Sequence, residues 1–320
     1  MPKSHTHMHQ HLQMPHAKLD LQALAGTLAF EQVTIIGNAS GDWQPATTGT
    51  TFIFNGTQWA ENSNVNNQIV NIANGGFAES KYAFVVQGHP QSGLLTQALT
   101  QVAIELTPQL SCWPSSGLTT IVLMQQLSQH VQVQRMSLFP SLARPNDLPP
   151  DDHLPCMVHN WLGERRIAQA LIPSLDWPEF SLASVFLPHL SAINQMQPCQ
   201  VAPRINAYNP FDLLERLQES NSLIADALNP ATQQMQLEWL ITLAHTPINI
   251  WQQFAHPSQL INTEALFFNH MPESKPSNWY LMDTQASQYL DAIRHSLAYC
   301  WQMLSTKHAS LIGNELSNGS

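Results

Sequence analysis

Three short apolar stretches, each followed at once by small or polar residues, constrain the fold of this chain more than any other feature. The stretches span residues 32–36, 51–54 and 82–86. The first is a β-branched run, which is typical of a central strand in a parallel sheet. Ligands of open α/β sheets bind beyond the carboxyl ends of the strands. Functional residues are therefore expected in the turns that open at Gly37, Asn55 and Gln87.

Helical patterns follow these strands. Residues 94–106 predict one helix, and Pro114-Ser115-Ser116-Gly117 opens a second helix over residues 118–129. A strand is then expected over residues 131–139, so this part has the turn, crossover helix and returning strand of a βαβ unit. Two stretches are interpreted as mainly loop, one rich in asparagine and one rich in proline: residues 62–76, with a short strand or turn of helix, and residues 140–155.

The second half of the chain has a different character. A helix is expected over residues 164–172, and further helical spacing recurs in four segments: residues 212–228, 232–244, 258–269 and 284–304. Asn209-Pro210 and Asn229-Pro230 are good helix boundaries. We therefore predict the α/β class with three parts, namely a His-rich leader with an edge helix (1–30), a nucleotide-binding domain with a mostly parallel sheet (31–172) and a mostly helical C-terminal region (173–320).

Composition excludes some classes of function. The chain of 320 residues has a formal net charge of −10 and only 12 Lys and Arg, which argues against a nucleic-acid partner. No apolar run approaches the roughly 18 residues of a transmembrane helix, and no secretory signal is recognisable at the start. The 4 cysteines are scattered and are expected to be free thiols. These features favour a bacterial-type cytoplasmic protein, either free or peripheral at the inner membrane.

The first residues carry alternating histidines. They are His5, His7, His9, His11 and His16. We interpret this leader as a disordered tail. The alternative interpretation is that its histidines bind a soft divalent metal.

Two strand-end turns are candidates for ligand binding. In Gly37-Asn38-Ala39-Ser40, glycine allows a ligand to approach the backbone, and the asparagine amide can donate and accept hydrogen bonds. Asn55 would lie beside Asn38 if their strands are neighbours. Ordinary turns, including an Asn-Gly β-turn at Asn55, explain the same residues.

The start of the second helix and a downstream histidine complete the candidate site. Hydroxyls and backbone N–H groups at Ser115, Ser116 and Gly117 suit a phosphate or carboxylate, although a serine N-cap is the simpler explanation. His159 is a candidate general base, and Glu164 would either orient it or cap the next helix. A DxD motif is absent, so we expect any nucleotide donor to be bound without a metal. The absence of GxGxxG and GxxxxGK[ST] argues against a dinucleotide fingerprint and a loop for nucleoside triphosphates, and the absence of GxSxG and HExxH argues against the familiar serine hydrolases and zinc peptidases.

The candidate residues jointly resemble the animal-type sialyltransferase family. The run from Thr34 to Ser40, with Phe52-Ile53-Phe54-Asn55, resembles the family's large motif. The residues from Pro114 to Leu118, with the helix and strand that follow, resemble its small motif, and His159 to Glu164 fits its H-x4-E motif. The resemblance covers roughly residues 32–165, and the shared order of the motifs is its specific part.

The resemblance implies a Rossmann-like transferase that uses a CMP-activated nonulosonic acid, usually sialic acid, as donor and a glycan as acceptor, with no cofactor. The implied donor contacts are Gly37, Asn38, Ser40, Asn55, Ser115, Ser116 and Gly117, with His153 standing in for the histidine of the family's third motif. His159 would take the proton from the acceptor hydroxyl in an inverting displacement at the anomeric carbon. Residues 173–320 follow the last motif and are expected to shape the acceptor site.

Three alternatives stay open. The same fold could use CMP-Kdo or another donor. The chain could instead be a non-catalytic binding or scaffold protein whose His-rich leader binds metal, or a degenerate enzyme that binds CMP and transfers nothing. The acceptor, the linkage formed and the oligomeric state are not specified by the sequence.

Overall fold

The chain folds into two compact units. The structure is a computed structural model that describes residues 19–24, 26–39, 41–56, 68–74, 82–143, 158–184, 208–222, 229–269 and 278–317. The first unit comprises Met1–Leu138 and Ala170–Phe180, and the second comprises Phe139–Gln169 and Ser181–Ser320.

This division differs from the predicted domain boundary after residue 172. Residues 139–169 belong to the second unit because their apolar side chains pack with its helices. Leu142 and Leu162 lie in one core with Leu290 and Leu297. The backbone N–H of Leu142 also donates to Asp291 Oδ1 over 2.8 Å.

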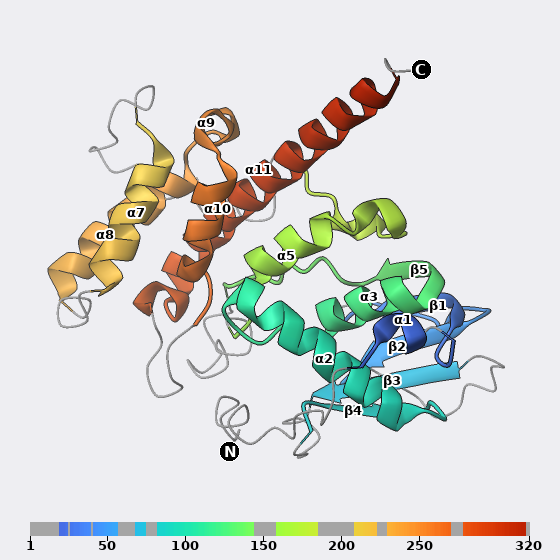
Figure 1. The fold of residues 1–320 in the computed structure, drawn as a ribbon. Coiled ribbons are helices and arrows are strands. Elements are labelled where there is room, and N and C mark those ends of the chain that lie inside the picture. The colour runs from blue at the N-terminus through green and yellow to red at the C-terminus, as the bar shows by residue number, and fades with distance from the viewer. Residues whose placement is uncertain are drawn as a thin grey trace. The chain divides into compact units, whose positions relative to one another are not determined.

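The first unit is built on a mostly parallel sheet (Figure 1). Its elements are α1 (Leu21–Leu24), β1 (Phe30–Ile36), β2 (Thr50–Phe54), β3 (Gln68–Asn74), β4 (Phe84–Gln87), α2 (Ser92–Leu110), α3 (Ser116–Leu127), β5 (Ser128–Gln134), η3 (Ile172–Ser174) and η4 (Pro178–Phe180). The five strands are ordered β4-β3-β2-β1-β5. All neighbours pair in parallel except β3 and β4, which are antiparallel. The predicted α/β class with a mostly parallel sheet is confirmed.

The order of the strands reverses at β1. From β1 the chain adds β2, β3 and β4 on one side, and after α2 and α3 it places β5 on the other side. β1 pairs with β5 up to Ile36 and Gln134. In open α/β sheets, the crevice beyond the carboxyl ends of the strands at such a reversal is the usual ligand site.

Two strands need comment against the prediction. The Asn-rich stretch 62–76, interpreted as a loop with a short strand or turn of helix, contains β3, whose Val70 and Ile72 are fully buried. The stretch expected to be the third strand forms β4 instead. Because β4 is antiparallel, Phe84 pairs with Asn74 at the carboxyl edge of β3, and Gln87 lies toward the opposite edge.

Burial explains why these segments form a sheet with helices on it. Val33, Ile35 and Ile36 of β1 are fully buried, and burying each such side chain contributes about 2 kcal/mol. Helices α2 and α3 pack on each other; α2 also packs on β4, and α3 on β1 and β5. They cover one face of the sheet in Figure 1. Ser115 caps the N-terminus of α3, since its Oγ accepts the backbone N–H of Leu118 at 3.2 Å.

A returning segment pairs with β5. The backbone N–H of Asp176 donates to Val131 O over 3.0 Å, and that of Val133 donates to Asp176 O over 2.8 Å. Residues 170–180 therefore complete the first unit after the chain has passed through part of the second.

The described elements of the second unit are helices. They are α5 (Trp161–Gln169), α7 (Pro210–Ser222), α8 (Pro230–Ala244), α9 (Ile248–Phe254), α10 (Pro257–Thr263), η5 (Glu264–Leu266), η6 (Trp279–Leu281) and α11 (Thr284–Ser317). Tyr289, Ile293 and Leu297 recur every fourth residue of α11 and lie in the core. Asn229 caps α8 by accepting the N–H of Ala231 at 2.9 Å, with Pro230 at the first helical position. The predicted boundary at Asn229-Pro230 is confirmed.

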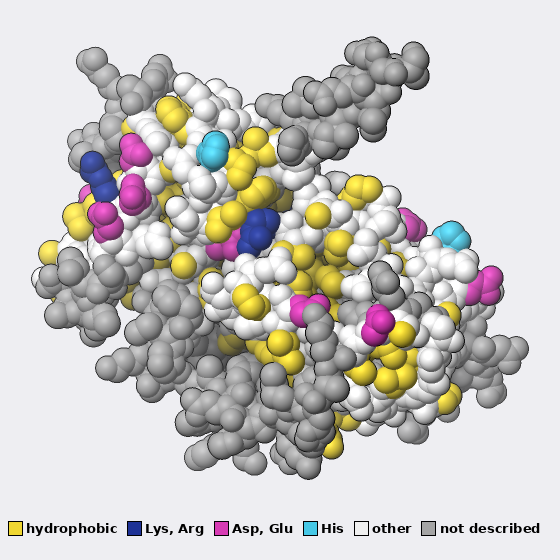
Figure 2. All heavy atoms as spheres, in the orientation of Figure 1, with side chains coloured by type: hydrophobic (Ala, Val, Ile, Leu, Met, Phe, Trp, Pro, Cys, Tyr) yellow, Lys and Arg dark blue, Asp and Glu magenta, His cyan; other side chains and the backbone are white. Residues whose placement is uncertain are grey.

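The surface carries few charges. On the face drawn in Figure 2, the charged side chains of the described residues are scattered among neutral polar and apolar atoms. Among the described residues, no helix combines the length and apolar character needed to cross a membrane. Cys300 is a free cysteine, and burial raises the pKa of its thiol to about 12.

Candidate functional site

Gly37 follows β1 directly and lies against the end of β5. Its backbone N–H donates to Gln134 O over 2.8 Å, which extends the pairing of the two strands. A Cβ at this position would lie 2.2 Å from Arg135 O and 2.7 Å from Met136 Cβ. Only glycine fits such an approach without a backbone shift. The next residue, Asn38, is exposed.

Asn55 ends β2 in a left-handed conformation, with φ of 52°. Its Oδ1 accepts the backbone N–H of Asn74 over 3.0 Å. The next residue, Gly56, has φ of 71° and donates its N–H to Asn71 Oδ1 over 2.9 Å. Asn55-Gly56 is therefore a hydrogen-bonded turn, as the simpler interpretation of this motif predicted. The Asn55 Nδ2 group makes no hydrogen bond with a described residue.

The start of α3 is hydrogen-bonded to the carboxyl end of β3. Ser116 Oγ donates to Asn74 Oδ1, so Asn55, Asn74 and Ser116 form one hydrogen-bonded chain. The Oγ of Ser115 is used as the helix cap. Among the described residues, no acceptor is found for the backbone N–H groups of Ser116 and Gly117. These are orphan donors at the positive end of a helix.

Arg135 and Met136 complete the edge after β5. A Cβ on Gly117 would lie 2.8 Å from Met136 Cε, so Met136 lies between Gly37 and Gly117. Arg135 has φ of 53° and donates from Nη2 to Ala39 O. Its Nε and Nη1 atoms are buried and have no hydrogen-bond partner among the described residues. The Nε1–H of Trp177 donates to Met136 O over 2.5 Å, which fixes this turn.

The structure thus brings together, at the carboxyl edge of the sheet in the first unit, five residues predicted as donor contacts: Gly37, Asn55, Ser115, Ser116 and Gly117. Asn38 follows Gly37 in the chain. Ser40 and His153 lie outside the described residues.

His159 and Glu164 belong to the second unit. His159 is half-buried, and its ring lies edge-on to Trp161 with the ring centroids 5.2 Å apart. Glu164 is fully buried in the first turn of α5.

Asn160, rather than Glu164, caps α5. Its Oδ1 accepts the N–H of Gly163 over 2.9 Å, and its Nδ2 donates to Glu264 Oε2 over 2.8 Å. Glu264 also pairs with Arg166, whose Nε is 2.6 Å from Oε1. A Cβ on Gly163 would lie 2.5 Å from Asn160 Nδ2. The asparagine ahead of an apolar pair was the sequence signal for this cap.

A second polar cluster, also buried, ties α11 to the segment after residue 139. Asp291 accepts the N–H groups of Leu142 and Ala143, at 2.8 and 3.2 Å, and pairs with Arg294 at 3.0 Å. Arg294 lies over the Phe139 ring, 4.3 Å from its centroid. Burial, together with the charges of Arg165 and Arg294, lowers the pKa of His295 from 6.5 to about 4. Burial and the charge of Arg294 lower the pKa of Arg165 to about 9.

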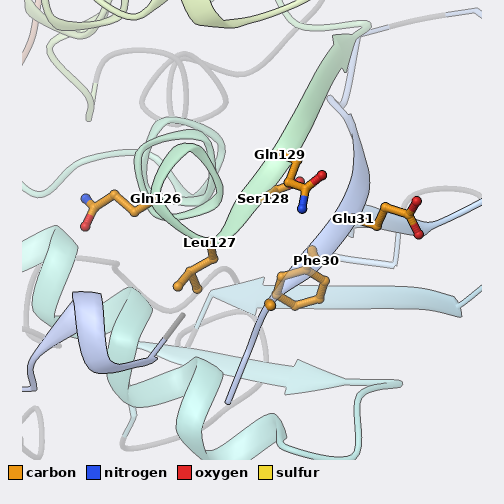
Figure 3. A pocket seen from close by; sticks show the side chains of 7 residues that line it. Phe30, Glu31, Gln126, Leu127, Ser128 and Gln129 are labelled. Atoms are coloured by element: carbon orange, nitrogen blue, oxygen red, sulfur yellow. The ribbon is translucent and has the colours of Figure 1, made fainter. Parts of the chain in front are cut away.

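A shallow hollow of about 520 Å³ lies at the opposite edge of the sheet, where β1 and β5 begin (Figure 3). Its lining includes Phe30, Glu31, Gln126 and Leu127. The side chains of Gln126 and Glu31 point away from each other in Figure 3. Binding pockets are expected to have convergent polar groups, so this hollow is a weaker candidate than the carboxyl edge.

No match is found for this chain among protein-family models, curated proteins or solved structures. The functional argument therefore depends on the geometry of the carboxyl edge. Among the described residues, no group of three or more His, Cys, Asp or Glu is placed to hold a metal ion.

Sequence reasoning missed Asn74, Arg135 and Met136. Asn74 lies in the stretch interpreted as a loop with a short strand or turn of helix, and its place at the end of a run with Val70 and Ile72 was a usable strand signal. Arg135 and Met136 were assigned to the interior of a strand over residues 131–139, whereas β5 ends at Gln134.

Proposed function

We propose that this chain is an inverting, metal-independent glycosyltransferase similar to sialyltransferases, with a Rossmann-like first unit that binds a CMP-activated nonulosonic acid. The observation that carries the proposal is the meeting of Gly37, Asn55, Ser116 and Gly117 where the strand order reverses. In open α/β sheets, nucleotides bind beyond the carboxyl ends of the strands at such a reversal. The order of the motifs in the sequence supports the same donor class.

The residues at this edge offer neutral hydrogen-bond donors and acceptors for a nucleoside. The amides of Asn38 and Asn55 can contact the base or ribose, since the Asn55 Nδ2 group is not used within the described residues. The N–H groups of Ser116 and Gly117 suit the negative charge of a phosphate or sugar carboxylate.

The proposed reaction is one displacement. The acceptor hydroxyl oxygen attacks the anomeric carbon, and the bond from that carbon to the phosphate oxygen breaks. The bonding electron pair leaves with CMP, and His159 takes the proton of the hydroxyl. Histidine suits this role because an imidazole can take up a proton near neutral pH, and the ring of His159 is half-buried.

Binding of the nucleotide is the first test. CMP and CMP-sialic acid are titrated by calorimetry into the wild-type chain and into Asn38→Ala. We expect binding to the wild type and weaker binding to the variant, in which an exposed side chain is truncated. No binding to the wild type at millimolar nucleotide would overturn the proposal.

Transfer is the second test. His159→Ala is expected to abolish transfer to a glycan acceptor and to bind CMP as the wild type does. A fully active His159→Ala would remove this histidine from its role. A screen that includes CMP-Kdo separates the donors. A thermal shift with nickel or zinc and none with CMP would favour the non-catalytic alternative, in which the leader binds metal.

A further inference from the structure

Arg135 stands out among the basic residues of the first unit. The segments Met1–Leu138 and Ala170–Phe180 contain only four basic side chains: Lys3, Lys18, Lys81 and Arg135. Of these, Arg135 is the one that the structure describes. It follows β5 directly, next to Gly37, at the point where the strand order reverses.

The guanidinium of Arg135 is incompletely satisfied. Arginine has five N–H donors, and within the described residues the side chain of Arg135 makes one hydrogen bond, from Nη2 to Ala39 O. Nε and Nη1 are buried without a partner, and no ion pair with a carboxylate is formed within the described residues. Buried donors of a charged group are costly to leave unpaired, so such a group calls for an explanation.

The surroundings favour an anion as the missing partner. Arg135 is joined through Met136 to Gly117, whose backbone N–H is one of the orphan donors at the start of α3. A planar guanidinium and a helix N-terminus both favour a phosphate. Arg135 also has an unfavourable φ of 53°, and its Nη2 reaches the turn after β1, where it donates to Ala39 O.

We propose that Arg135 contacts the phosphate of the nucleotide donor and stabilises its charge as CMP leaves. This inference rests on the proposed function. The phosphate of the donor is a diester with one negative charge, and breaking the bond from the anomeric carbon to oxygen produces a phosphate monoester, which gains a second charge. Arg135 would therefore bind the product phosphate more strongly than the donor phosphate, which assists the departure of CMP.

The test compares CMP with cytidine, which lacks the phosphate. Both are titrated by calorimetry into the wild type, Arg135→Gln and the control Arg216→Gln, which makes the same change at an exposed position of α7. We expect the wild type and the control to prefer CMP over cytidine by roughly tenfold or more, and Arg135→Gln to lose most of that preference. Cytidine should bind equally to all three.

The outcomes separate the two proposals. If the wild type binds neither CMP nor cytidine, the proposed function fails, and the role of Arg135 fails with it. If the wild type prefers CMP and Arg135→Gln keeps that preference, the role of Arg135 alone is overturned. Circular dichroism checks folding of each variant. If Arg135→Gln does not fold, Arg135→Lys is used instead, because lysine keeps the positive charge but lacks the paired N–H donors of the guanidinium. Arg135→Lys should prefer CMP over cytidine, but by less than the wild type does.

Discussion

The side-chain oxygen of Asn55 accepts the backbone N–H of Asn74 over 3.0 Å, which links the carboxyl ends of β2 and β3. This bond gives Asn55 a structural role that can be separated from a role in ligand binding. The oxygen belongs to the turn, whereas the Nδ2 group has no partner among the described residues. The two roles can be tested with different substitutions.

Asn55→Asp is expected to fold normally and to bind CMP poorly. The aspartate keeps the oxygen that accepts from Asn74 and tolerates the positive φ of this position. Stability should therefore stay within about 0.5 kcal/mol of the wild type, while the loss of the NH₂ donors and the added negative charge weaken nucleotide binding. Urea denaturation and calorimetry measure the two effects.

Asn55→Gly is the control for the turn. Glycine accepts the backbone conformation but loses the bond to Asn74, so a loss of about 1 kcal/mol in stability is expected. If Asn55→Asp binds CMP as tightly as the wild type does, Asn55 is a turn residue only.

Gly37→Ala should destabilise the first unit. The added methyl group would lie 2.2 Å from a backbone oxygen, which cannot rotate away as a side chain can. We expect a loss of about 1–3 kcal/mol in the free energy of unfolding, measured by urea denaturation. The matched control is Gly93→Ala in the first turn of α2, where a Cβ meets nothing within 4 Å. It should be neutral or stabilising by about 0.5–1 kcal/mol. Equal stability of the two variants would contradict the close approach at Gly37.

Asp291→Asn should destabilise the second unit strongly. The carboxylate accepts two backbone N–H groups and neutralises Arg294, which is fully buried. Removal of one charge from a buried pair costs about 3–5 kcal/mol. Asp212→Asn in α7 makes the same change at an exposed position and should stay within about 0.5 kcal/mol of the wild type. A loss for Asp291→Asn as small as that of the control would show that the cluster does not depend on this charge.

Acid should weaken the fold through His295. Its pKa is lowered to about 4 in the folded chain by burial and by Arg165 and Arg294, so below pH 6.5 the unfolded chain binds the proton more readily. The stabilisation is complete above pH 6.5 and is lost as the pH falls toward 4, by up to about 3 kcal/mol for a shift of this size. Urea denaturation at several pH values measures the slope.

His295→Gln removes this titration and should flatten the slope between pH 6.5 and 4 by up to one proton. His245→Gln, at an exposed position, is the control and should leave the slope as it is in the wild type. An unchanged slope in His295→Gln would assign the acid sensitivity to other groups.

The sequence predicted the parts of the fold that have strong local signals. The β-branched run before Gly37 and the serine cap of α3 both have such signals, and both are found where they were expected. The strand β3 was predicted only as one option within a loop, because asparagine is depleted in strands, and its pairing with β2 and β4 makes Asn71 and Asn74 part of a sheet. Tertiary pairing outweighed local propensity there.

The candidate site was predictable to a similar extent. Glycine and asparagine after a strand suggest a ligand crevice, and this placed Gly37 and Asn55 correctly at one edge. Arg135 could not be found in that way, because nothing in the residues around it signals that the strand ends at Gln134 and that arginine adopts a positive φ. Its unpaired donors are visible only once the chain is folded.

The pairing of Asp176 with Val131 and Val133 has a consequence for synthesis on the ribosome. Asp176, which pairs with β5, is synthesised 44 positions after Gln132, after residues that belong to the other unit. Until then β5 is an unpaired edge strand of the nascent sheet, and such an edge can associate with other chains. A fragment that ends at residue 138 would keep this unpaired edge, so no single truncation point yields both units intact.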